Sequence, residues 1–181
     1  MRDNKIQNLT LTALMTAIIC IIGPIVIPIG MVPMSFANMA IYLTIILLNK
    51  KKAFISTAIY LLIGLTGIPV FAGFSGGAGK LFGPTGGYLM GYLVLCLVGG
   101  SLLENGICRG KQKIGNQILA LSAGNLGLYF IGTWWLMYQS KLNLMTALSV
   151  GVFPFMLFDI IKIILAVSIA NSIKRRISFL L

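Results

Sequence analysis

The sequence predicts an all-α integral membrane protein, a bundle of six transmembrane helices that forms one domain across residues 1–181. Of the 181 residues, 58% are apolar and only 9% are charged, whereas a soluble domain is about half apolar and a quarter charged. The apolar residues fall into six runs, and a helix needs roughly 20 residues to cross a bilayer. The basic residues gather between these runs, as is typical of loops that set membrane topology.

Taken in order, the apolar runs give the helices and their connections. Pro24 and Pro28 break the first helix near its far end. A long glycine-rich stretch, residues 66–87, separates the third helix from the fourth, and the last run is long enough to tilt in a bilayer or to protrude from it. The predicted helices cover residues 6–22, 35–48, 53–65, 88–103, 114–138 and 145–173.

The distribution of positive charge predicts the orientation of the chain. If the chain crosses six times, eleven lysines and arginines fall on one side, and only Lys80 and Lys141 fall on the other. Because positively charged loops stay in the cytoplasm, both termini are predicted to be cytoplasmic and the glycine-rich stretch to be a long outer loop. The same clustering argues against a nucleic-acid-binding face, despite a net charge of +11. The eleven are Arg2, Lys5, Lys50, Lys51, Lys52, Arg109, Lys111, Lys113, Lys174, Arg175 and Arg176.

The inventory of reactive side chains excludes most catalytic chemistry. The chain has no histidine, so Ser-His-Asp and Cys-His arrangements are impossible. Its three cysteines show no C-x-x-C spacing, so neither a zinc site nor a disulfide framework is expected. The sequence before Lys80 fails as a phosphate-binding loop, because Phe74 replaces the first glycine and Leu81 replaces the magnesium-binding hydroxyl. We therefore predict no enzyme and no metal, and any ATP that drives transport must be hydrolysed by another polypeptide.

Asp159 and Lys162 are the outstanding feature of the last apolar run. Three residues apart, they share one face of a helix. A charge at the centre of a membrane helix costs about 2.5–3.5 kcal/mol on insertion scales, so such residues usually face the bundle interior and mark a site. Two interpretations remain open, a structural ion pair that neutralises itself and, as we favour, a pair that contacts a polar ligand. A single acid also permits a proton-coupled carrier.

Other residues give weaker signals. Asn125, in an apolar run, is expected either to hydrogen-bond a ligand or to bridge two helices. Tyr88 follows the glycine-rich stretch and is expected to cap a pocket or to sit in an aromatic belt. Ala13 and Ala17 form a small-residue stripe on the first helix, which suits internal packing or the docking of a partner.

Three motifs resemble those of a known family. The stretch P-V-F-A-G-F-S-G-G-A-G-K-L-F-G-P-T-G-G-Y-L, residues 69–89, closely resembles the signature of the BioY family, and its G-P-T-G-G-Y block is the specific part. These proteins are the biotin-specific substrate-binding subunits, or S components, of energy-coupling factor transporters. The F-P-F-x-x-x-D-x-x-K of residues 153–162 is similar to the family's last helix, and the V-P-M-S-F of residues 32–36 resembles its second-helix entry.

The resemblance implies a six-helix S component in the bacterial cytoplasmic membrane that captures biotin from outside. It implies a transmembrane coupling protein and two cytoplasmic ATPases as partners, with Ala13 and Ala17 as the docking motif. Biotin is then the transported ligand, and no cofactor is expected. Asp159 and Lys162 match the polar ligand-binding pair of the family.

Biotin has ureido N–H groups, a ureido carbonyl and a carboxylate tail. Asp159 can accept from the ureido N–H groups, and a lysine can donate to the carbonyl or to the carboxylate. Which end of biotin Lys162 meets stays open. The family's substrate lies near the outer face under loops, which gives as ligand-binding candidates Asp159, Lys162, Tyr88, Asn125, Phe74, Lys80 and Thr85.

The chain departs from the family pattern at Gly73 and Ala37, where relatives carry asparagine and glutamine nearby. We expect Lys80 or Tyr88 to supply a compensating contact. Two alternatives stay open. One is an S component for thiamine or riboflavin, against which the G-P-T-G-G-Y block argues. The other is a stand-alone secondary transporter that uses Asp159 as a proton carrier.

Overall fold

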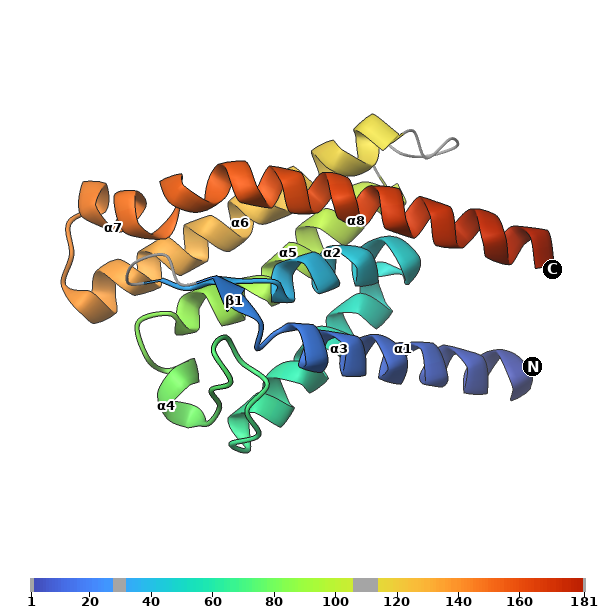
Figure 1. Cartoon of the computed structure of the whole chain (residues 1–181), viewed down its shortest axis with the longest axis horizontal. Coiled ribbons are helices and arrows are strands. Elements are labelled where there is room, and N and C mark those ends of the chain that lie inside the picture. The colour runs from blue at the N-terminus through green and yellow to red at the C-terminus, as the bar shows by residue number, and fades with distance from the viewer. Residues whose placement is uncertain (1, 28–31, 106–113, 181) are drawn as a thin grey trace.

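In the computed structural model, which describes residues 2–27, 32–105 and 114–180, helices run along one long axis (Figure 1). Both ends of the chain lie at one end of the bundle, and α4 and α7 lie toward the other (Figure 1). The helices in these residues are α1 (Arg2–Ile22), α2 (Ala37–Leu47), α3 (Lys50–Leu65), α4 (Ala78–Leu81), α5 (Gly86–Asn105), α6 (Ile114–Ser140), α7 (Leu144–Gly151) and α8 (Phe153–Leu180). Two short antiparallel strands, β1 (Val26–Ile27) and β2 (Met34–Ser35), connect α1 to α2.

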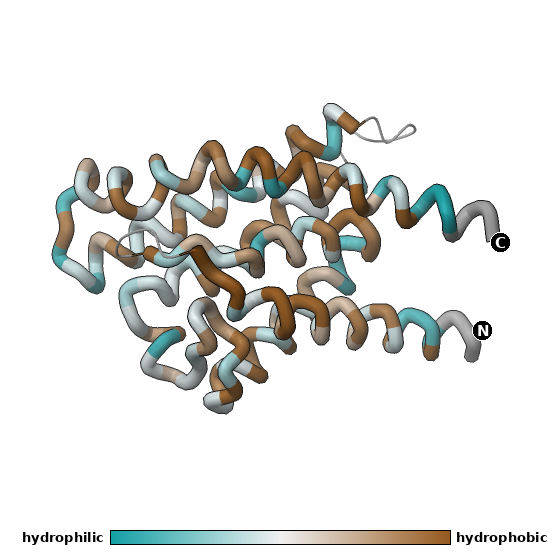
Figure 2. The backbone as a smooth tube through the Cα atoms, viewed as in Figure 1, coloured by the Kyte–Doolittle hydropathy of each residue, from teal (hydrophilic) through white to brown (hydrophobic). Residues whose placement is uncertain are grey.

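The outer surface of the bundle is apolar along the helices. Within the described residues, three segments are long and apolar enough to cross a membrane, namely Lys5–Ile22, Gly86–Glu104 and Leu144–Arg176. Large apolar side chains on α8, such as Leu157 at 67% exposure, point outward. Hydrophobic residues cover the helix shafts in Figure 2, and hydrophilic ones gather toward the ends. Such a surface is unsuited to water and matches a protein surrounded by lipid.

The prediction of one continuous sixth helix is wrong. Residues 145–173 divide into α7 and α8 at Val152, whose φ of −130° and ψ of −60° leave the helical region. Pro154 follows two residues later, and proline lacks the N–H group that a continuous helix would use there. The first turn of a new helix tolerates proline, so α8 starts at Phe153. The other predicted helices correspond to α1, α2, α3, α5 and α6, with ends that differ by at most four residues.

A tight polar turn joins α2 to α3. The Asn49 side chain caps α3 by accepting a 3.1 Å hydrogen bond from the Lys52 backbone N–H. The Glu104 carboxylate, at the end of α5, accepts a 2.5 Å hydrogen bond from the backbone N–H of Lys50. An acid at a helix N-terminus is favourable, so this contact ties the turn to α5. The predicted basic cluster of Arg109, Lys111 and Lys113 lies outside the described residues.

The glycine-rich stretch is partly folded onto the bundle. Val70, Phe71 and Leu81 are buried, whereas Phe74 and Phe82 are 72% and 58% exposed. The Phe71 ring packs edge-on against Tyr60 of α3, with ring centroids 5.6 Å apart. At the far end, the indole N–H of Trp135 donates a 2.9 Å hydrogen bond to the carbonyl of Gly83. These contacts fix the stretch to α3 on one side and to α6 on the other.

Helices α5 and α6 form the most extensive helix pair. A Cβ atom on Gly124 would lie 2.9 Å from Leu95 Cδ1 and 3.0 Å from the backbone nitrogen of Gly99. Small residues at such positions let two helix backbones approach closely. The closely packed α5–α6 pair carries Tyr88, Tyr92 and Tyr129, three of the side chains of the site described below.

Replacing Gly124 with leucine should loosen this helix pair. Overpacking a close interface costs about 1–3 kcal/mol, so we expect G124L to unfold at a clearly lower temperature in detergent. The matched control is G115L on the same helix, because no atom lies within 4 Å of a Cβ placed at Gly115. Equal unfolding temperatures for the two variants, followed by tryptophan fluorescence, would contradict the close packing of α5 on α6.

Candidate functional site

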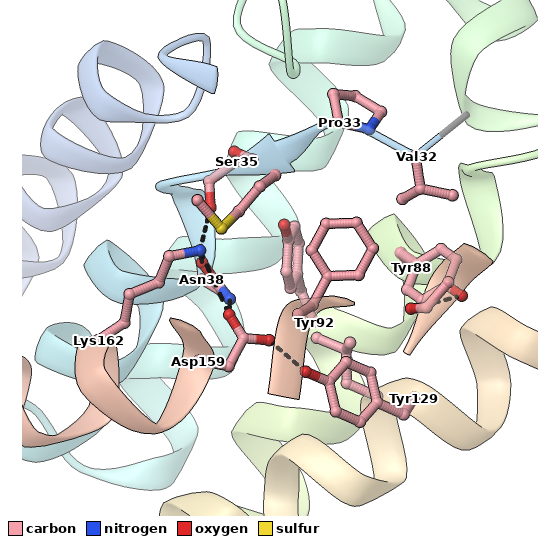
Figure 3. A pocket seen from close by; sticks show the side chains of 13 residues that line it. Val32, Pro33, Ser35, Asn38, Tyr88, Tyr92, Tyr129, Asp159 and Lys162 are labelled. Atoms are coloured by element: carbon pink, nitrogen blue, oxygen red, sulfur yellow. Dashed lines mark hydrogen bonds and ion pairs between the residues drawn. The ribbon is translucent and has the colours of Figure 1, made fainter. Parts of the chain in front are cut away.

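A cavity lies where α2, α5, α6 and α8 meet beneath strand β2. The space within it is about 410 Å³ when its open mouth is counted. Figure 3 shows Asp159, Asn38 and Lys162 on one side of it and Tyr88 on the other. We call this the Asp159 cavity, and its polar lining consists of Ser35, Asn38, Tyr88, Tyr92, Tyr129, Asp159 and Lys162. Its apolar lining consists of Val32, Pro33, Met34, Leu128 and Phe155, with Gly151 between them.

Four donors surround the Asp159 carboxylate. Its Oδ1 accepts hydrogen bonds from the Asn38 amide at 2.6 Å and from Lys162 Nζ at 3.2 Å. Its Oδ2 accepts a 2.6 Å hydrogen bond from the Tyr129 hydroxyl and a long one, 3.5 Å, from the Asn125 amide. The donors come from α2, α6 and α8 itself, so the carboxylate joins three helices at one point.

Lys162 is equally well satisfied. Its Nζ donates to the backbone carbonyl of Ser35 at 2.8 Å, to Asn38 Oδ1 at 3.3 Å and to Asp159 Oδ1 at 3.2 Å. The same ammonium lies 5.4 Å from the centroid of the Phe36 ring, which adds a cation–π contact. All three N–H groups of the ammonium therefore have acceptors in the protein.

The ion pair is buried and has no net charge. Asp159 and Lys162 are each only 4% exposed. Removing two charges from water is costly, and their attraction offsets that cost only when further hydrogen bonds satisfy both groups. The donors and acceptors around this pair meet that condition. A neutral but strongly polar cavity wall suits an uncharged ligand that carries both N–H donors and a carbonyl acceptor.

Two glycines make room for Tyr88. A Cβ atom on Gly132 of α6 would collide with the Tyr88 ring, and one on Gly151 at the end of α7 would collide with its hydroxyl group. The hydroxyl donates a 3.1 Å hydrogen bond to the carbonyl of Gly151. The break between α7 and α8 thus holds Tyr88 against the side of the Asp159 cavity.

A second cavity adjoins the first. It measures about 360 Å³ including its mouth, and we call it the Lys80 cavity. Lys80, at the end of α4, and Thr85 supply its polar side chains beyond those it shares with the Asp159 cavity, and Phe71 and Leu89 are among its apolar residues. Five residues line both cavities, namely Val32, Pro33, Ser35, Tyr88 and Tyr92.

Most of the predicted site residues come together here. Asp159, Lys162 and Tyr88 line the Asp159 cavity, and Lys80, Thr85 and Tyr88 line the Lys80 cavity. Asn125 lies behind the cavity wall and hydrogen-bonds Asp159 while accepting a 2.7 Å bond from the Tyr42 hydroxyl, so in this structure it bridges helices. Phe74 is exposed and lines neither cavity.

Sequence reasoning missed Asn38, Tyr92 and Tyr129. Asn38 is a buried amide in the apolar helix α2, and an isolated amide in such a run was a usable signal. The tyrosines gave no such signal, because an aromatic residue in a membrane helix is ordinary. Among the described residues, no group of three or more histidine, cysteine or acidic side chains is placed to hold a metal ion.

Together, the fold and the site define a helical membrane protein with a polar cavity built around a buried ion pair. The model of the BioY family matches residues 1–179. The biotin transporter BioY2 of Lactococcus lactis subsp. cremoris is 37% identical over 178 residues, covering 98% of this chain and 96% of that protein. The biotin transporter BioY of Thermotoga maritima is 36% identical over 170 residues, covering 93% and 96%.

A solved structure agrees with these relatives. The crystal structure of the S-component for biotin from an ECF-type ABC transporter superposes with a TM-score of 0.89 at 33% identity, covering 97% of this chain and 94% of that chain. This chain therefore belongs to the BioY family, and the resemblance inferred from its motifs is confirmed.

Breaking the ion pair should destabilise the protein more than replacing it as a whole. In D159N, Lys162 stays buried without its counter-ion, and in K162M the Asp159 carboxylate stays buried without its own. Either change should lower the free energy of unfolding by about 3–5 kcal/mol. The double variant D159N/K162M should lower it by clearly less than the sum of the two single changes, measured by denaturant unfolding in detergent. Strictly additive losses would show that the two side chains are not coupled.

Proposed function

We propose that this chain is the biotin-binding S component of an energy-coupling factor transporter and that it captures biotin for uptake across the bacterial cytoplasmic membrane. The observation that carries the proposal is the likeness to the solved S-component for biotin over nearly the whole chain. The polar cavity adds independent chemical support, because its donors and acceptors suit the ureido ring of biotin.

The proposed binding mode places the ureido ring beside the ion pair. The ring's N–H groups donate to the Asp159 carboxylate, and its carbonyl accepts from Lys162 or from the Asn38 amide. These partners already bond one another, so the ligand exchanges polar contacts instead of meeting a bare charge. Leu128, Phe155 and Tyr92 supply an apolar and aromatic enclosure for the sulfur-containing ring. A contact from Phe74 would require the glycine-rich stretch to move, because this side chain is 72% exposed.

The proposed topology has six membrane-crossing helices, α1, α2, α3, α5, α6 and α8, in one domain across residues 1–181. Both termini are cytoplasmic and the glycine-rich stretch lies outside. The two ends of the chain share one end of the bundle (Figure 1). Of the basic residues predicted to be cytoplasmic, those in the described part of the chain lie near the start of α1, in the first turn of α3 and near the end of α8. The positive-inside rule then sets the orientation.

The proposed partners are a transmembrane coupling protein and two cytoplasmic ATPases. Ala13 and Ala17 are exposed on α1, while Thr16 and Ile19 of the same helix are buried against the bundle. Exposed small residues allow another helix to approach closely, so this face of α1 is suited to the coupling protein.

The test of the ligand is equilibrium binding of labelled biotin to the purified chain in detergent, with unlabelled biotin, thiamine and riboflavin as competitors. Saturable binding near one per chain, displaced by biotin alone, is the expected result. Loss of a charged hydrogen bond costs about 1.5–3 kcal/mol, so D159N and K162A should weaken binding at least about tenfold.

The matched control for these variants is N171A. Asn171 also lies on α8 and exchanges hydrogen bonds with Gln117 of α6 at 2.9 and 3.4 Å, but it lines neither cavity. The N171A variant should bind biotin with the same affinity as the parent chain. If D159N and K162A remain within twofold of N171A, the ion pair has only a structural role.

The docking face is tested by co-purification. The double substitution A13W/A17W should abolish recovery of the coupling protein with the tagged chain, because two large rings prevent close helix contact. It should leave biotin binding unchanged. The control L157W places the same ring at an exposed site on α8 and should co-purify normally. Recovery of the coupling protein with A13W/A17W would place the docking face elsewhere.

A further inference from the structure

We infer that Lys80 determines specificity for the ligand's carboxylate, and that biotin lies across both cavities with its ureido ring at Asp159 and its carboxylate at Lys80. This inference rests on the proposed function. It also decides which end of the ligand Lys162 meets, a question that the sequence left open.

The two cavities differ in net charge. In the Asp159 cavity the two charged side chains form an ion pair at 3.2 Å and cancel each other. In the Lys80 cavity, Lys80 is the charged side chain of the lining, and Thr85 adds a hydroxyl group. One end of the combined site is therefore neutral and the other is positive.

No acid in the described part of the chain lines the Lys80 cavity. The whole chain has three acids. Asp159 pairs with Lys162, and Glu104 binds the backbone at the start of α3. Asp3 lies in the first turn of α1, at the opposite end of the bundle from α4 (Figure 1). A ligand carboxylate is the natural counter-ion for an ammonium group at the cavity wall.

Lys162 does not suit the ligand carboxylate, because its ammonium is already paired with the Asp159 carboxylate at 3.2 Å. A second carboxylate beside Asp159 would bring two like charges together in a buried site, which is strongly unfavourable. An uncharged ring avoids this repulsion, so the neutral end of the ligand belongs there.

A mainly apolar boundary connects the two cavities. Val32, Pro33, Tyr88 and Tyr92 line both cavities and offer a mainly apolar boundary, which suits the methylene tail of biotin. Lys80 is also held in place by its neighbours. Leu81 is 5% exposed, and the N–H of Gly77 donates a 2.7 Å hydrogen bond to the carbonyl of Gly64. The short helix α4 thus holds Lys80 in the wall of the Lys80 cavity.

The experiment compares biotin with biotinamide, whose tail carries no charge. The parent chain should bind biotin about two- to fivefold more tightly than biotinamide, because a partly exposed ion pair contributes up to about 1 kcal/mol. The affinity of K80M for biotin should fall to its affinity for biotinamide, and its affinity for biotinamide should equal that of the parent chain. K80R should retain the preference. K141M, which removes the lysine between α6 and α7 that lines neither cavity, should match the parent chain.

The outcomes separate this inference from the proposed function. If K80M lowers the affinity for both ligands equally, or changes neither affinity, Lys80 does not bind the carboxylate. The inference is then overturned, while the proposal that the chain binds biotin stands. If the folded parent chain binds neither ligand, the proposed function itself is wrong and this inference falls with it. Raising the salt concentration should reduce the preference for biotin in the parent chain but not in K80M.

Discussion

The structure depends on one buried ion pair in an apolar bundle. Asp159 and Lys162 are each 4% exposed, in a helix whose other faces suit lipid. Two charges in such a place are tolerated only if each is paired and hydrogen-bonded. That requirement recruits Asn38 from α2 and Tyr129 from α6, and it fixes the point at which these helices meet α8. The cavity exists where their side chains converge.

The same requirement defines what the cavity can bind. Because the pair is neutral and every polar group in it has a partner, a ligand gains by exchanging hydrogen bonds, and a charged group would disturb the balance. The other cavity is lined by Lys80, beside the glycine-rich stretch, and its lining holds no acid. The scarcity of acids, three in 181 residues, thus divides the site into a neutral end and a positive end.

Close helix packing around the cavity supports this arrangement. Glycines at the α5–α6 contact bring the two backbones together, and the glycines beside Tyr88 leave space that its ring and hydroxyl fill. The break at Val152 turns the end of α7 toward Tyr88, whose hydroxyl binds the Gly151 carbonyl at 3.1 Å. A continuous helix over residues 145–173 would not present that carbonyl, so the irregularity belongs to the site.

The sequence by itself determined the membrane class, the helical runs, the family and the ion pair. These follow from local properties, namely apolar length, charge placement and the spacing of Asp159 and Lys162 along one helix. Only the tertiary structure decided which side chains from other helices complete the pair, because Asn38 lies 121 residues from Asp159 and no local pattern joins them. It also decided that Asn125 bridges helices, that Phe74 faces outward, and that Pro154 follows a break between two helices. Such outcomes depend on packing between distant segments, which local periodicity does not encode.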